Sequence, residues 1–107
     1  MSFRHDKLQS KIQELAAAFL AHEASPRSLI TVTGFELSED NRHGTILLSV
    51  YPKIEERAAL DFARRKRGEF KHYIYEHLRV GHLPELDFAL DAGEAHRQRI
   101  DEIVNQI

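Results

Sequence analysis

The densest group of reactive side chains in this 107-residue sequence is a run of four cations, Arg64-Arg65-Lys66-Arg67. Residues 57–79 carry seven Lys or Arg against three Asp or Glu, whereas the segments on either side are acidic and bring the formal net charge to −2. Long cationic side chains gathered within a Debye length bind RNA phosphates, and Arg grips a phosphate with two hydrogen bonds. The cluster therefore predicts binding to an RNA backbone. The alternative is a solvated basic helix balanced by the acidic tail.

Catalytic chemistry has no comparable signal in the sequence. Cysteine is absent, which excludes disulfides, thiolate zinc sites and a thiol nucleophile. The five glycines are never two or three residues apart, so Gly-x-x-Gly, Rossmann and Walker patterns are missing. Asp87 and Asp91 are expected on the outward face of a strand, and no carboxylate pair falls in an apolar pocket by sequence. We therefore expect no enzyme activity and no cofactor.

Histidine is frequent, with seven residues, but its spacing does not favour a metal site. His72 and His77 would point to diverging faces of a helix, and no two histidines have the His-x-x-x-His spacing. We expect no bound metal, and we interpret His72 and His82 as polar contacts beside the basic cluster. Arg27, which follows a proline after the first helix, is a further candidate for a phosphate contact.

Two helical stretches are expected before and at the start of the basic cluster. Apolar residues from Leu8 to Phe19 recur at helical spacing, which predicts a helix that begins near Asp6 and ends at Ser25-Pro26. A later helix is expected to begin at Pro52, because proline suits the first position of a helix. Its apolar stripe is expected to consist of Ile54, Ala58, Ala59, Phe62 and Ala63.

This later helix is expected to bend at Gly68. Apolar residues resume at helical spacing from Phe70 to Leu78, but a step of four back from Phe70 reaches Lys66, so the two stripes are out of phase. Gly68 would be either a kink in one helix or the C-cap between two helices, and both give a bend. A bend at this point gathers the cations at a corner of the molecule.

Strand signals surround these helices. Residues 29–37 and 44–51 predict a hairpin, with a bulge at Gly34 where the apolar parity switches. Leu86, Phe88 and Leu90 alternate strictly with polar or small residues, which predicts a third strand, and apolar spacing from Ile100 to Ile107 predicts a last helix. The expected fold is an α+β sandwich of order α-β-β-α-(bend)-α-β-α, with a three-stranded sheet and the helices on one face.

A chain of this length forms one domain, expected over residues 1–107 with a core at about 5–92 and a C-terminal helix at about 93–107. The longest stretch without Asp, Glu, Lys or Arg runs from His43 to Pro52, far short of a membrane span. The N-terminus shows no apolar signal core. We therefore expect a cytoplasmic protein without a membrane partner.

Four landmarks follow one another along the chain: Ser25-Pro26-Arg27, the segment from Thr31 to Asp40, Leu83-Pro84-Glu85-Leu86-Asp87-Phe88 leading into Asp91, and Arg99-Ile100-Asp101. Together with the order of elements, these landmarks resemble the ribosome-binding factor A family. The likeness covers about residues 5–104. The family has a type II KH-like fold, with a kink between its central helices at an Ala-x-Gly motif; the matching positions here, Lys66-Arg67-Gly68, keep the glycine and lose the alanine.

This resemblance implies a non-enzymatic ribosome assembly factor. Such a factor binds the small ribosomal subunit and its precursor ribosomal RNA, assists late RNA processing and subunit maturation, and is associated with growth in the cold. A monomer is expected, with ribosomal proteins as further partners for its acidic remainder. Together with the charge pattern, the resemblance predicts an RNA-binding site made of Arg57, Arg64, Arg65, Lys66, Arg67, Gly68, Lys71, His72, Arg79 and Arg27.

Two other hypotheses remain open from the residues alone. One is a protein–protein module that dimerises through an exposed face around Leu47 and Tyr51 and does not bind RNA. The other is a small acyl- or phosphoryl-handling enzyme of α+β type, which rests only on fold analogy.

Overall fold

The structure, a computed structural model, describes residues 3–23 and 27–93. The expected order of helices and strands is confirmed up to the third strand, while the expected C-terminal helix falls on residues 94–107, outside the described part. The elements are α1 (Phe3–Glu23), β1 (Leu29–Leu37), β2 (His43–Tyr51), a 3₁₀ turn η1 (Lys53–Glu55), α2 (Glu56–Arg65), α3 (Arg67–His77) and β3 (Glu85–Leu90).

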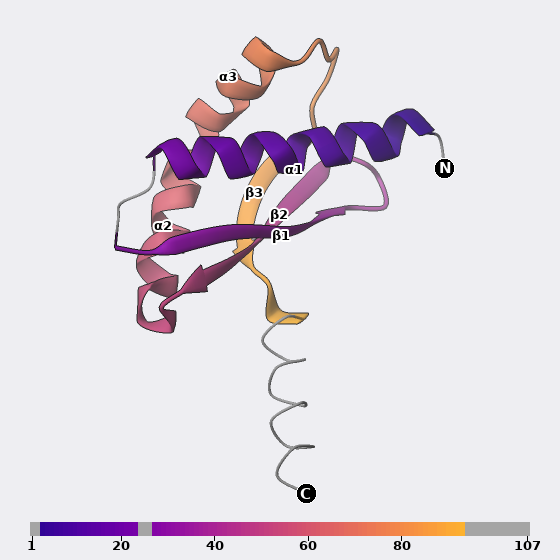
Figure 1. The fold of residues 1–107 in the computed structure, drawn as a ribbon. Coiled ribbons are helices and arrows are strands. Elements are labelled where there is room, and N and C mark those ends of the chain that lie inside the picture. The colour runs from indigo at the N-terminus through magenta and orange to yellow at the C-terminus, as the bar shows by residue number, and fades with distance from the viewer. Residues whose placement is uncertain (1–2, 24–26, 94–107) are drawn as a thin grey trace, which may run out of the picture.

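The three strands form one mixed sheet in the order β1-β2-β3. β1 and β2 are antiparallel, and their register shifts between Val32 and Gly34, which confirms the expected bulge. β3 lies parallel to β2, so the chain has to cross from one end of the sheet to the other through α2 and α3. In Figure 1, α1 passes in front of β2 and β3 with its axis nearly aligned with β1, and α2 and α3 follow one another along one side of the molecule.

The core lies on a single face of this sheet. Alternate residues of the central strand, Ile46 and Leu48, have no exposed surface, whereas Leu47 between them is only half-buried. Three aromatic rings join the helices to the sheet: Phe70 of α3 lies 5.3 Å from Phe19 of α1 and 5.6 Å from Phe88 of β3, measured between ring centroids. Such tilted pairs add to the free energy gained by burying the rings. The helices are therefore fixed to one face of the sheet, as expected.

Three details of the expected helices are wrong. The first helix begins at Phe3 and not near Asp6, and the α-helix expected to begin at Pro52 begins at Glu56. Ile54 does not belong to a buried stripe, because its exposed fraction is 88%, and Ala58 is also exposed. The cause is the 3₁₀ turn after Pro52: a turn of three residues puts Ile54 out of phase with the α-helix that follows. Of the expected stripe, Ala59 and Ala63 are buried.

Removal of the Phe70 ring should destabilise the fold strongly, because the ring is fully buried and contacts two other rings. We expect Phe70→Ala to lower the free energy of unfolding by about 3–5 kcal/mol, measured by urea denaturation. Tyr75→Ala on the same helix is the matched control, since Tyr75 is 44% exposed, and it should cost about 1 kcal/mol or less. Equal losses in the two variants would contradict the central place of Phe70.

Candidate nucleic-acid interface

The basic cluster lies where α2 ends and α3 begins. Arg65 is the last residue of α2, Arg67 is the first of α3, and Lys66 between them has φ −93° and ψ 7°, outside the helical region. The backbone N–H of Lys66 donates to the carbonyl of Ala63 at 3.1 Å, and its carbonyl accepts from Phe70 at 2.9 Å. The expected bend is thus present as a tight turn without a loop. We call residues 64–68 the elbow.

The bend lies at Lys66 and not at Gly68, contrary to expectation. Gly68 is the second residue of α3, and it does not have a positive φ. A Cβ atom built on Gly68 would meet nothing within 4 Å, so neither a C-cap nor close helix packing requires glycine here. The backbone of Lys66 accommodates the change of direction, since ψ near 0° is accessible to residues with side chains.

One carboxylate connects the two sides of the elbow to the sheet. Arg64 of α2 donates from Nε to Asp87 Oδ1 at 3.1 Å and from Nη2 to Oδ2 at 3.3 Å. Arg67 of α3 places Nη1 3.2 Å from the same Oδ1 and donates from Nε to the carbonyl of Arg64 at 2.9 Å. Asp87 lies on β3 between the buried Leu86 and Phe88, so the pleat directs its side chain away from the core. Both arginines therefore reach around the edge of β3.

The electrostatic environment of Asp87 favours its ionised form. Partial burial by itself would raise the pKa of Asp87, but the backbone N–H of Phe88, the hydrogen bonds from Arg64 and the positive charges of Arg64 and Arg67 together lower this pKa below its ordinary value of 3.8. Asp87 is therefore a carboxylate at neutral pH and remains paired with both arginines.

The outer side of the elbow is an open hollow with mainly positive walls. Its lining residues are Asp61, Arg64, Arg65 and Arg67. Arg65 is exposed and makes no hydrogen bond or ion pair among the described residues. The side chains of Arg64 and Arg67 remain 48% and 45% exposed in spite of their contacts with Asp87. An anion that enters the hollow from solvent can thus meet three guanidinium groups.

Lys66 is the least exposed cation of the cluster. Its side chain is 29% exposed, its Nζ lies 3.5 Å from a carboxylate oxygen of Glu69, and the same atom is 5.9 Å from the centroid of the Phe62 ring. The ammonium group thus lies between a carboxylate and an aromatic face, and Lys66 is not among the residues that line the hollow.

Four other expected site residues lie outside the elbow, on α2, on α3 and in the segment that follows α3. The side chain of Arg57 is almost fully exposed, and its Nε lies 3.7 Å from Oδ2 of Asp61 on the next turn of α2. Lys71, His72 and Arg79 are exposed as well. Because the helix is interrupted at Lys66, the spacing of seven between basic residues does not produce one continuous ridge of charge. These residues flank the elbow instead of joining it.

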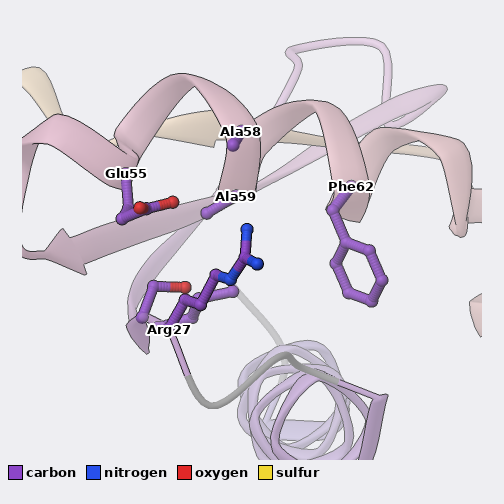
Figure 2. Close-up of a pocket in the computed structure, with 7 residues that line it drawn as sticks. Arg27, Glu55, Ala58, Ala59 and Phe62 are labelled. Carbon is purple, nitrogen blue, oxygen red and sulfur yellow. The ribbon is translucent and has the colours of Figure 1, made fainter.

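Arg27 belongs to a different cleft, between the start of β1 and the first half of α2. Figure 2 shows its guanidinium group directed toward α2, in the space near Ala59 and Phe62. The structure therefore does not bring Arg27 into the hollow of the elbow. The lining of this second cleft consists of Arg27, Ser28, Ile30, Glu55, Ala58, Ala59 and Phe62.

Metal ligands do not converge in the part of the chain that the structure describes: no group of three His, Asp or Glu side chains has a suitable arrangement. His77 has its Nδ1 2.8 Å from the carbonyl of Tyr73, and its ring lies 4.1 Å from the Tyr73 ring. Within residues 3–23 and 27–93, no helix is both long and apolar enough to cross a membrane.

Sequence reasoning missed the role of Asp87. The alternation of the third strand placed Asp87 correctly on the outward face, but it did not indicate a partner. The available signal was topological. Asp87 points away from the face of the sheet that the helices cover, and the arginines can reach it because β3 is an edge strand. The sequence does not reveal this strand order.

Comparison with known proteins gives one consistent family. The sequence model of the family described as ribosome-binding factor A matches residues 4–104. A ribosome-binding factor A from Thermomicrobium roseum is 33% identical over 109 residues, which cover 99% of this chain and 84% of that protein.

Solved structures agree on the fold. The crystal structure of ribosome-binding factor A from Thermus thermophilus has a TM-score of 0.68 at 22% identity, covering 79% of this chain and 93% of that chain. A homology model of the Thermus thermophilus protein, fitted into a cryo-EM map of a 30S complex with that factor, has a TM-score of 0.67 at 23% identity, covering 78% and 90%. The expected KH-like α+β fold is thereby confirmed.

The Asp87 pairs should make stability depend on pH in the acid range. Because the pKa of Asp87 is lowered in the folded protein, its contribution is complete above the unfolded-state pKa of about 3.9 and is lost as the pH falls through the folded-state pKa. Between about pH 5 and pH 2, the free energy of unfolding of the wild type should therefore fall more steeply than that of Asp87→Asn, measured by denaturant titration at each pH. Parallel profiles would contradict the pairing of Asp87 with the elbow.

Proposed function

The chain belongs to the ribosome-binding factor A family, and we propose that it binds the small ribosomal subunit through its elbow and assists the maturation of that subunit. The single observation that carries the proposal is the hollow in which Arg64, Arg65 and Arg67 converge at the bend between two helices. The 30S complex that contains the Thermus thermophilus protein supports the choice of subunit.

Recognition in this proposal is by shape and phosphate contacts. Arg65 offers its whole guanidinium group, while Arg64 and Arg67 offer the edges that Asp87 leaves exposed. The turn at Lys66 and the contacts with β3 hold these groups at a defined separation, so they fit a backbone whose phosphates have matching positions. Base identity matters little to such a surface. The target would be a folded element of the ribosomal RNA, not a particular base sequence.

The flanking cations extend this surface in the proposal. Arg57 on α2, and Lys71, His72 and Arg79 after the elbow, contact phosphates on either side of the central hollow. The exposed Gly68, with no side chain, lets RNA approach the first turn of α3 closely. Lys66 contributes charge from its half-buried position. Arg27 is a separate and weaker contact from its own cleft.

The finer parts of the proposal follow the family resemblance. The target is precursor ribosomal RNA late in its processing, and the protein acts in the cytoplasm as a monomer without catalysis. Its acidic remainder limits binding to unrelated RNA and faces ribosomal proteins, which are basic. Growth in the cold would depend on the protein, because misfolded RNA escapes slowly from its traps at low temperature.

Loss of the cluster should abolish binding to subunits. We expect a variant with Arg64, Arg65, Lys66 and Arg67 all changed to Ala to lose comigration with small subunits in sucrose gradients, because its hollow has no cations left. The control changes Lys11, Arg42 and Lys53 to Ala, which removes exposed cations outside the elbow, and this variant should still comigrate. The proposal would be contradicted by wild-type protein that never comigrates with small subunits, or by a cluster variant that still does.

Binding should also weaken steeply with salt. If four or five phosphates are neutralised, a doubling of the salt concentration should lower the affinity about tenfold. Filter binding of wild-type protein to small subunits at several salt concentrations measures this slope. A nearly flat profile would show that contacts other than phosphates dominate.

A further inference from the structure

Two of the three arginines that line the hollow are already paired with an anion of the protein itself, the carboxylate of Asp87. We propose that Asp87 is a specificity-determining residue of this interface: it occupies Arg64 and Arg67, and RNA gains both arginines only when its phosphates displace the carboxylate. The inference rests on the proposed function, because it concerns the same surface. It goes further by naming the residue that makes unsuitable RNA bind poorly.

The geometry of the carboxylate resembles that of a bound phosphate. Asp87 accepts two hydrogen bonds from the Nε–Nη2 edge of Arg64, the edge that matches two oxygens of a carboxylate or a phosphate equally well. The Nη1 atom of Arg67 lies 3.2 Å from one of the same oxygens. A phosphate cannot use this edge of Arg64 while Asp87 holds it. The two anions must therefore compete.

The exchange is physically accessible because the pairs lie at the surface. The side chains of Asp87, Arg64 and Arg67 are 39%, 48% and 45% exposed, so water can replace each contact as it opens. Ion pairs in such positions are weak compared with buried pairs, whose partners lose water when they separate. Asp87 can therefore be displaced without unfolding β3.

Contact with Arg65 determines which anions displace Asp87 from the other two arginines. Arg65 lines the hollow together with Arg64 and Arg67 but makes no ion pair with Asp87 or with any other described carboxylate. A phosphate that contacts Arg65 together with Arg64 and Arg67 makes more contacts than the carboxylate did, whereas an anion that reaches only one arginine gains nothing by displacing it. Because of Asp87, tight binding requires several phosphates in matching positions, and one well-placed phosphate is not enough.

A purely structural role for Asp87 predicts a different outcome. If the carboxylate only fastened the elbow to β3, its loss would lower the stability of the fold and weaken binding to every RNA alike. Competition predicts instead that loss of the carboxylate strengthens binding, and that unsuitable RNA gains more than the small subunit does. The ratio of the two affinities separates the two roles.

The test compares Asp87→Asn with Glu69→Gln. Both variants remove one negative charge near the elbow and preserve side-chain size, but Glu69 pairs with Lys66 and does not touch the arginines of the hollow. Filter binding to polyuridine and to small subunits is measured for the wild type and both variants at several salt concentrations.

We expect Asp87→Asn to bind polyuridine roughly three- to tenfold more tightly, with a salt slope steeper by about 1.4 if both released arginines contact phosphate. Its affinity for small subunits should rise less, so that discrimination falls. Glu69→Gln should keep the discrimination and the slope of the wild type. An equal effect of both variants, unchanged discrimination or weaker binding by Asp87→Asn would each overturn the inference. Wild-type protein that binds no subunits would overturn the proposed function as well.

A measurement on the unaltered protein keeps the inference testable if Asp87→Asn does not fold. The carboxyl carbon of Asp87 and the Nε atoms of Arg64 and Arg67 are followed by NMR while a short polyuridine RNA is added at low salt. Displacement predicts that the Asp87 signal moves in step with those of both arginines. RNA binding that shifts Arg65 and leaves the Asp87 signal in place would overturn the competition.

Discussion

The shared carboxylate of Asp87 is the constraint on which the geometry of the elbow depends. It receives Arg64 from the end of one helix and Arg67 from the start of the next, so two elements that change direction at Lys66 are held to the same point of β3. In the free protein this common partner holds two long side chains of like charge close together, and in the proposed complex RNA phosphates take its place. The same two guanidinium groups line the hollow together with Arg65. The charge cluster is therefore an organised surface, not merely a basic stretch of helix.

The core sets the position of this surface. Ala63 immediately before the elbow and Phe70 shortly after it have no exposed area, and the ring of Phe70 contacts Phe88 on the strand that carries Asp87. Phe88 faces the core and its neighbour Asp87 faces outward, because successive residues of a strand alternate between the two sides. The packing of the apolar residues thus places Asp87 on the outer side of β3, within reach of the arginines. Ordinary core packing and the candidate interface share one strand.

Much of this arrangement could be predicted from local patterns. The bulge at Gly34, the three strands and the bend follow from apolar spacing, which depends on residues close together in the chain. The exact place of the bend did not follow, because the backbone of Lys66 can make the turn as well as glycine. The exposure of Ile54 was missed, since a 3₁₀ turn leaves no clear signal in the sequence. The pairing of Asp87 requires the strand order, which single-residue patterns do not contain.

The partners of the ion pairs at the elbow lie far apart in the chain, because β3 reaches its place beside β2 only after α2 and α3. Arg64 and Asp87 are 23 positions apart, and the strand that carries the acid is the last to join the sheet in chain order. As a nascent polypeptide leaves the ribosome, the cations of α2 and α3 precede their counter-ion into solution. The ion pairs of Arg64 and Arg67 with Asp87 form only when β3 docks. Until then the two arginines have no carboxylate of β3 to hold them, so the restraint on the proposed RNA-binding surface forms after the helices that carry it.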